Sequence, residues 1–224
     1  MLRHAHSTAN EKGVLAGRAP GIELSAKGVQ QAEALSPFLS SLTIDHVISS
    51  PLTRCLSTIA PFLSLTSASQ IGTPSFKGSF RIDDRLIEMD YGRWTGKKLS
   101  TLSRRQLWRT IQTNPSAVEF PGGESFLTMQ NRVDDVIDEI ANERIPRRKS
   151  KNYLIVTHGD ICKYISTRLL GLPFNDFQRF HVDPASLSIF TLTESKCLVS
   201  KINYSIAIQE NLPTSKFALG GSNL

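Results

Sequence analysis

Two short apolar segments, each followed at once by polar residues and a helical pattern, constrain the fold of this chain most strongly. Residues 152–157 form an apolar run that ends at His158. Residues 45–48 form a shorter β-branched run that ends at the polar pair Ser49 and Ser50. Buried strands that alternate with helices are typical of a largely parallel sheet covered on both faces. The sequence therefore predicts an α/β fold, a single three-layer α/β/α domain with its site at the carboxyl ends of the strands.

Other periodic segments support this architecture. Apolar side chains recur at helical spacing over residues 126–140, which predicts an amphipathic helix. Residues 186–192 and 197–202 are typical of a β-hairpin at the edge of the sheet. Pro51, preceded by a serine that can cap, predicts a helix that begins at this proline.

The length of 224 residues accommodates one such domain with an insertion. We expect the domain to span residues 1–210, with a cap insertion at about 75–125 and a loose tail over 211–224. The part of the insertion that covers the site is expected within residues 99–114. Its basic and aromatic side chains are Arg104, Arg105, Trp108 and Arg109.

Charge and cysteine content narrow the class of partner. The chain has a formal net charge of +6, which favours anionic partners. Its dense basic run at 144–151 is more typical of a solvated loop than of a nucleic-acid patch. The cysteines show no paired spacing and no segment resembles a membrane span or a signal peptide, so we expect a cytoplasmic protein. The expected partner is a small phosphorylated substrate, not nucleic acid or membrane, and the chain is expected to be a monomer or a homodimer.

Four short polar segments carry the candidate chemistry, although each is weak evidence alone. They contain Arg3 and His4 with Ser7 and Asn10, then Arg54, Glu88, and His158 with Gly159. A neutral imidazole is a good nucleophile toward phosphorus near neutral pH. Guanidinium groups match phosphate oxygens, and a carboxylic acid can protonate a leaving alkoxide and then activate water. Together these groups supply a phosphoryl-transfer site that needs neither a metal nor a cofactor.

The same segments resemble the signatures of the histidine phosphatase superfamily, also called the phosphoglycerate mutase-like family. The resemblance covers residues 3 to about 190 and is strongest to its small broad-specificity phosphatases. The similar motifs are Arg3-His4, residues 50–54 with the second arginine, Glu88 with Gly92, Trp94 and Gly96, and His158-Gly159.

This resemblance implies a role for each residue. His4 would be the phosphorylated nucleophile and Glu88 the general acid and base. The phosphoryl group would be held by Arg3, Arg54 and His158, with further contacts from Asn10, Ser7 and Gly159. No metal is implied.

The chain departs from the family pattern near its start. Ala5 replaces the usual glycine after the nucleophile, and His6 stands where Glu or Gln is common, so His6 receives no role. Only Met1 and Leu2 precede Arg3, whereas family members have a longer first strand. We therefore expect either a start further upstream or a shortened central strand.

Three alternatives stay open. A phosphoglycerate mutase would use the same core, but Glu88 is followed here by Met-Asp-Tyr-Gly in place of the mutases' Arg-His-Tyr-Gly. His4 and His6 could instead bind a metal together with His158 or His181 and an aspartate. A pseudophosphatase that only binds phosphorylated ligands would have no need of Glu88.

Overall fold

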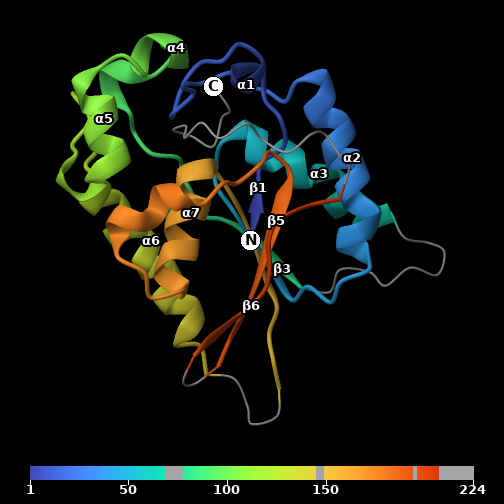
Figure 1. Cartoon of the computed structure of the whole chain (residues 1–224). Coiled ribbons are helices and arrows are strands. Elements are labelled where there is room, and N and C mark those ends of the chain that lie inside the picture. The colour runs from blue at the N-terminus through green and yellow to red at the C-terminus, as the bar shows by residue number, and fades with distance from the viewer. Residues whose placement is uncertain (69–77, 145–148, 194–195, 207–224) are drawn as a thin grey trace.

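A computed structural model describes residues 1–68, 78–144, 149–193 and 196–206. Within these residues a six-stranded sheet has the order β3-β2-β4-β1-β5-β6 (Figure 1). The strands are β1 (Leu2–Arg3), β2 (His46–Ser49), β3 (Ser79–Ile82), β4 (Tyr153–Thr157), β5 (Ser186–Leu192) and β6 (Cys197–Ser205). Neighbours from β3 to β1 are parallel, and β5 is antiparallel to both β1 and β6. The sheet is therefore mostly parallel, as the sequence predicts.

Helices cover both faces of this sheet (Figure 1). One face carries α2 (Ala26–Ser40) and α3 (Thr53–Ala68), and the other carries α6 (Phe126–Ala141) and α7 (Gly159–Leu169). Alternate strand residues point to opposite faces. Accordingly Leu154 packs in the cluster with α2 and α3, whereas Ile155 packs in the cluster with α6 and α7. The three-layer α/β/α fold is confirmed.

The remaining elements are short. They are α1 (Thr8–Glu11), α4 (Leu99–Leu102), α5 (Gln106–Thr113) and 3-10 turns at Asp84–Leu86, Gly92–Trp94, Pro115–Ala117 and Phe174–Arg179. The segment with α4 and α5 is held together by the stacked rings of Trp94 and Trp108, whose centroids lie 6.4 Å apart. It is joined to the loop after α1 by backbone hydrogen bonds, including Leu15 N to the Lys97 carbonyl at 2.9 Å.

The central strand β1 is only two residues long but is bonded on both sides. Leu2 is fully buried and pairs with Val156 of β4 and Leu187 of β5. The ladder extends past each end of the strand, because His4 N donates to the Thr157 carbonyl and the amino group of Met1 to the Ser188 carbonyl. A short strand thus carries Arg3 and His4 into the middle of the sheet.

Two sequence-based expectations differ from the structure, and a third concerns residues that the structure does not describe. The helix expected to begin at Pro51 is α3, and it begins two residues later, at Thr53. Residues 79–82 of the expected cap form edge strand β3, so the excursion from the sheet starts at Asp83. The tail at 211–224, together with residues 145–148 of the basic run, lies outside the described residues. None of the helices in the described ranges is both long and apolar enough to cross a membrane.

Candidate active site

The five predicted catalytic side chains lie at the carboxyl ends of neighbouring strands. Arg3 ends β1 and His4 follows it, Arg54 lies in the first turn of α3 after β2, and His158 directly follows β4. Glu88 lies in the loop after β3. None of the five side-chain positions is more than 4% exposed. The rings of His4 and His158 lie with their centroids 5.3 Å apart and their planes tilted by 60°.

The imidazole of His4 has a defined tautomer and charge state. Its Nδ1 lies 2.7 Å from the Ala5 carbonyl oxygen, and a carbonyl can only accept, so Nδ1 carries the hydrogen. The lone pair is then on Nε2. Burial lowers the pKa of His4 well below its ordinary value, and the charges of Arg54 and Arg3 lower it further. His4 is consequently neutral near pH 7.

The loop that carries His4 is held by contacts that sequence motifs do not reveal. Thr58 Oγ1 on α3 accepts from Ala5 N at 2.8 Å and donates to the Arg54 carbonyl at 2.6 Å. Gln31 Oε1 on α2 accepts from His6 N at 2.9 Å. The Thr58 hydroxyl thus joins the backbone next to His4 to the backbone of Arg54.

Gly28 allows this loop to approach α2. A Cβ atom placed on Gly28 would lie 1.9 Å from the His6 carbonyl oxygen. We expect Gly28→Ala to destabilise the fold by about 1–3 kcal/mol or more, because this overlap outweighs the helix propensity gain of about 1 kcal/mol. Chemical denaturation measures the change, with Gln30→Ala on the exposed side of the same helix as the control. Equal stability of the Gly28→Ala variant and the wild type would contradict this account of the loop.

The two arginines are anchored through the backbone. Arg3 Nη1 donates to the Val182 carbonyl at 2.6 Å, and Arg54 Nη2 donates to the Gly17 carbonyl at 2.8 Å. The buried Nε of Arg54 has no hydrogen-bond partner among the described residues. Buried donors are normally satisfied, so an unsatisfied guanidinium donor is expected where an anion binds.

His158 has a polar partner that lies far away in the sequence. Its Nε2 lies 2.7 Å from Ser50 Oγ, and Cys55 Sγ lies 3.5 Å from the same nitrogen. Ser50, predicted as a helix cap, accepts from Leu52 N at 3.4 Å and also orients this ring. Burial, followed by the charge of Arg54, lowers the pKa of His158 well below its ordinary value. His158 is therefore a neutral hydrogen-bonding group.

Glu88 has the opposite electrostatic environment. Burial first, and then the negative charge of Asp160, raise the pKa of Glu88 to about 7. Its Oε1 accepts from Met89 N at 2.9 Å. Arg18 Nε donates to the Glu88 carbonyl at 2.8 Å and Arg132 Nη1 to the Ile87 carbonyl at 2.6 Å, which fixes the loop. A carboxyl that titrates near neutral pH can both give and take a proton.

The three predicted accessory residues lie near the nucleophile or at a helix start. Ser7 caps α1: its Oγ donates to Asn10 Oδ1 at 2.8 Å and accepts from Asn10 N at 3.3 Å. Their oxygen atoms are thus engaged in a capping box. Gly159 is the first residue of α7, where backbone N–H groups have no partner within the helix.

The histidines of the metal alternative have separate partners. His6 Nδ1 lies 2.8 Å from Ser25 Oγ, and His181 Nε2 lies 2.8 Å from Asp183 Oδ1. No group of three or more His, Cys, Asp or Glu side chains is arranged to hold a metal ion in the described part of the chain.

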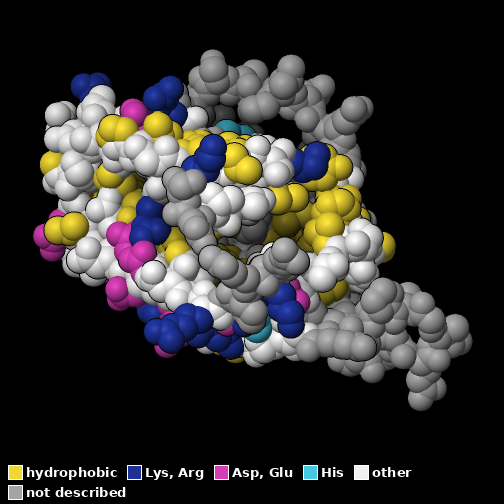
Figure 2. All heavy atoms as spheres, turned by 90° about the horizontal axis from the view of Figure 1, so that it is seen from below, with side chains coloured by type: hydrophobic (Ala, Val, Ile, Leu, Met, Phe, Trp, Pro, Cys, Tyr) yellow, Lys and Arg dark blue, Asp and Glu magenta, His cyan; other side chains and the backbone are white. Residues whose placement is uncertain are grey.

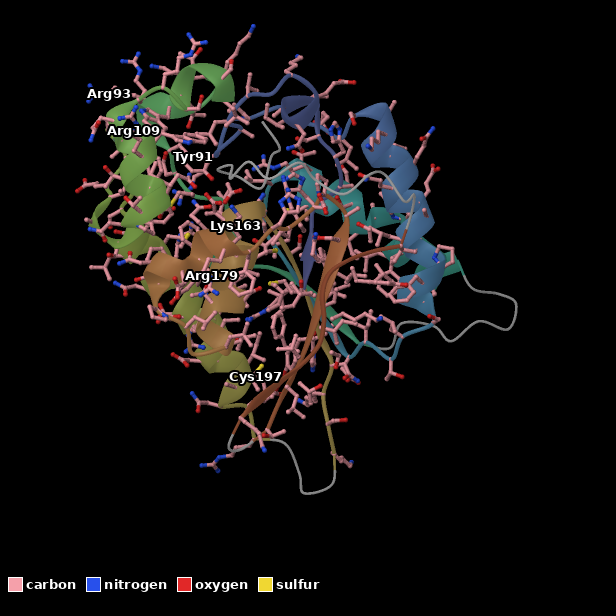
Figure 3. The ribbon with its side chains drawn as sticks, viewed as in Figure 1. Tyr91, Arg93, Arg109, Lys163, Arg179 and Cys197 are labelled. Atoms are coloured by element: carbon pink, nitrogen blue, oxygen red, sulfur yellow. The ribbon has the colours of Figure 1, made fainter. Side chains whose placement is uncertain are left out.

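The segment over residues 91–118, beside the site, has six basic residues and no acidic one. Its formal charge therefore equals the formal net charge of the whole chain, +6. Between Asp90 and Glu119 the sequence has no acidic residue. Its basic residues are Arg93, Lys97, Lys98, Arg104, Arg105 and Arg109, and all six are exposed. Figure 3 shows Arg93 and Arg109 on the outer side of this segment. By contrast, basic and acidic side chains are intermixed on the face seen from below in Figure 2. The charge asymmetry favours anions approaching from the cap.

Comparisons with known proteins show which family this chain is similar to. The family profile described as histidine phosphatase superfamily (branch 1) matches residues 1–205. Phosphoserine phosphatase 1 of Hydrogenobacter thermophilus is 29% identical over 215 residues, which cover 94% of this chain and 93% of that protein. A probable phosphoglycerate mutase of Salmonella choleraesuis is 27% identical over 202 residues, which cover 89% of this chain and 87% of that protein.

A solved structure shares the fold. The alpha-ribazole phosphatase of Shigella flexneri superposes with a TM-score of 0.75 at 24% identity, covering 94% of this chain and 98% of that chain. The family profile extends from the first residue to the end of β6, and so includes every strand of the sheet and every residue of the site. The chain therefore belongs to branch 1 of the histidine phosphatase superfamily.

Proposed function

We propose that this protein is a metal-independent phosphomonoester hydrolase that works through a phosphohistidine on His4. The observation that carries the proposal is the pairing of a neutral His4 with a carboxyl, Glu88, whose pKa is raised to about 7. The guanidinium groups of Arg3 and Arg54 are buried at the same edge of the sheet. Nucleophile, acid and anion-binding groups are the components that phosphoryl transfer requires.

In the first step, His4 Nε2 forms a bond to phosphorus as the bond to the leaving oxygen breaks. The protonated Glu88 donates its proton to that oxygen, and the alcohol leaves. Arg3, Arg54 and His158 hold the equatorial oxygens of the transferring group, with further hydrogen bonds from the amide group of Asn10 and the backbone at Gly159. Ser7 contributes by capping α1, because its N–H and its hydroxyl both donate to Asn10 Oδ1.

In the second step, the Glu88 carboxylate takes a proton from water as the water oxygen attacks phosphorus. The bond between phosphorus and His4 Nε2 breaks, and inorganic phosphate leaves. Glu88 is protonated again and His4 is neutral, so both groups are ready for the next substrate.

The pH dependence of kcat/KM follows from these two groups. We expect kcat/KM for an alkyl phosphate to fall as pH rises through about 7, because ionisation of Glu88 removes the required proton. The limb that reports protonation of His4 should lie well below pH 6.5, because the pKa of His4 is lowered. Initial rates over a pH series give the profile, and a basic limb that persists unchanged in Glu88→Gln would contradict the assignment.

Turnover should survive chelation. The charge of the transferring phosphoryl group is neutralised in this proposal by Arg3 and Arg54, which take the place of the metal ions of other phosphoryl-transfer enzymes. Rates measured with and without excess EDTA should be equal. Loss of activity that a divalent ion restores would overturn the proposal of metal independence.

The substrate is tested by measuring phosphate release from a panel of sugar phosphates, phosphoglycerates, nucleotides, aryl phosphates and phosphoserine. Phosphoserine is included in the panel because one relative is named as a phosphoserine phosphatase. The exposed basic residues of the cap favour small anionic substrates over neutral ones.

A mutase is the second candidate because another relative is named as one. Met89 and Tyr91, which follow Glu88, are fully buried, and this turn presents no basic side chain until Arg93. Phosphate release that exceeds interconversion of 2- and 3-phosphoglycerate supports the hydrolase, whereas the reverse supports the mutase.

A further inference from the structure

A buried polar cluster beside Glu88 takes no part in the proposed reaction. Tyr91 Oη donates to Asp160 Oδ2 at 2.7 Å, and Lys163 Nζ lies 3.6 Å from Asp160 Oδ1. Lys163 Nζ also donates to Gln178 Oε1 at 2.9 Å. Asp160 and Tyr91 are fully buried, and Lys163 and Gln178 are at most 5% exposed. Tyr91 belongs to the Glu88 loop and Lys163 to α7, as Figure 3 shows by their positions.

Burying a carboxylate is costly unless donors and an opposite charge compensate for lost water. Asp160 has both kinds of compensation. The phenol of Tyr91 donates to one carboxylate oxygen, and the ammonium group of Lys163 lies near the other. The phenol keeps its proton because burial and the charge of Asp160 raise the pKa of Tyr91 well above its ordinary value. The Asp160 carboxylate therefore lies at the start of α7, with its charge partly balanced by Lys163, and Tyr91 connects it to the loop that carries Glu88.

Opposing charges act on the Glu88 carboxyl. Burial and Asp160 from α7 favour its protonated form. The hydrogen bond from Met89 N, followed by the charges of Arg54 from α3 and Arg3 from β1, favours its ionised form.

Other ionisable groups nearby act less directly on this carboxyl. Arg18 and Arg132 contact the Glu88 carbonyl and pair with Glu124. The thiol of Cys162, whose pKa is raised to about 12, is neutral. Lys163 is paired with Asp160, and its charge also interacts with Glu88 and favours the ionised form of that carboxyl.

We propose that Asp160, held in place by Tyr91 and Lys163, is a positioning residue whose negative charge keeps the Glu88 carboxyl protonated against the pull of Arg3 and Arg54. The inference rests on the proposed function, in which Glu88 is the general acid. The hydrogen bond from Tyr91, three residues after Glu88, also ties the acid's loop to the helix that follows His158. Without Asp160, a larger fraction of the acid would be ionised near neutral pH at the start of the catalytic cycle.

Asp160→Asn tests this role, because it preserves size and an acceptor for Tyr91 but removes the charge. The basic limb of kcat/KM for an alkyl phosphate should move to lower pH by about one unit or more, which means about a tenfold loss above both midpoints. The rate of phosphoenzyme formation from p-nitrophenyl phosphate, whose leaving group needs little protonation, should change much less. Asp160→Ser provides a second neutral variant in case the asparagine amide crowds Lys163.

The matched control is Asp134→Asn. Asp134 Oδ1 also accepts from a tyrosine, Tyr164, at 2.6 Å and pairs with a basic side chain, that of Arg168. It lies on α6 and is not among the charges that shift Glu88. Its replacement should leave the pH profile unchanged, and melting curves of all variants verify that they are folded.

A direct readout avoids dependence on turnover. The infrared carbonyl band of the protonated Glu88 carboxyl, assigned by its loss in Glu88→Gln, is followed as pH is raised in wild type and Asp160→Asn. A lower midpoint in Asp160→Asn supports the inference. An unchanged midpoint overturns it while leaving Glu88 as the acid. If Glu88→Gln leaves the basic limb of kcat/KM in place, the proposed role of Glu88 is wrong and the inference falls with it.

Discussion

Replacing His4 by alanine should reduce phosphate release to background, a loss of about 10⁴–10⁶-fold. The substitution removes the Nε2 lone pair that accepts the phosphoryl group, while Arg3, Arg54 and Glu88 remain in place. No phosphoenzyme should form with any substrate. Steady-state rates and quenched reactions with labelled substrate measure the two effects.

His6→Ala is the matched control for this change. His6 lies two residues from the nucleophile, and its ring bonds to Ser25 Oγ. Its backbone N–H still reaches Gln31 after the substitution. We expect activity close to that of the wild type, and a His4→Ala variant as active as His6→Ala would exclude His4 as the nucleophile.

The loss of activity in Glu88→Gln should depend on the leaving group of the substrate. The variant keeps His4 and both arginines but has no proton to donate. Phosphoenzyme formation from an alkyl phosphate should slow by about 10²–10⁴-fold, the usual contribution of a positioned acid. With p-nitrophenyl phosphate the same step should be much less affected, because its leaving group is stable as an anion. Stopped-flow release of p-nitrophenol and phosphate release from alkyl phosphates provide the comparison.

Asp90→Asn is the control for Glu88→Gln. Asp90 Oδ1 accepts from Gly92 N at 2.9 Å and lies two residues from Glu88. If Glu88→Gln lowers the rates with both substrates equally, and the loss caused by Asp90→Asn depends on the leaving group, then the acid is Asp90. Glu88 would in that case have a structural role.

The sequence predicts the layers of the fold, and it identifies five candidate side chains that the structure places at one edge of the sheet, for physical reasons. Residues 153–157 form a strand buried on both faces, so its apolar run is continuous and easily recognised. Helix α6 buries one face, which leaves the 3.6-residue periodicity in the sequence. Polar residues directly after such strands lie at the site edge in this architecture. His158 and Ser50 follow that rule.

Other features escape prediction because their partners are distant in the sequence. Ser50 is an ordinary cap candidate by local pattern, yet its hydroxyl bonds to His158, 108 residues away. Thr58, Gln31 and the Tyr91–Asp160 pair are likewise defined by contacts between separate elements. No local periodicity encodes such contacts.

Strand β3 escapes prediction for a different reason. It lies at the edge of the sheet, and Phe80 and Ile82 remain 40% and 51% exposed. A short edge strand with exposed side chains on both faces has no burial pattern to mark it. Residues 79–82 were therefore expected to belong to the cap.

The central claim is that His4 carries the phosphoryl group, and trapping that intermediate tests it most directly. Glu88→Gln is mixed with p-nitrophenyl phosphate, quenched at alkaline pH to preserve phosphohistidine, and mapped by mass spectrometry. Because hydrolysis of the intermediate lacks its base in this variant, we predict one acid-labile phosphoryl group per chain, located on His4. A phosphoryl group on another residue, or turnover without any phosphoenzyme, would contradict the account.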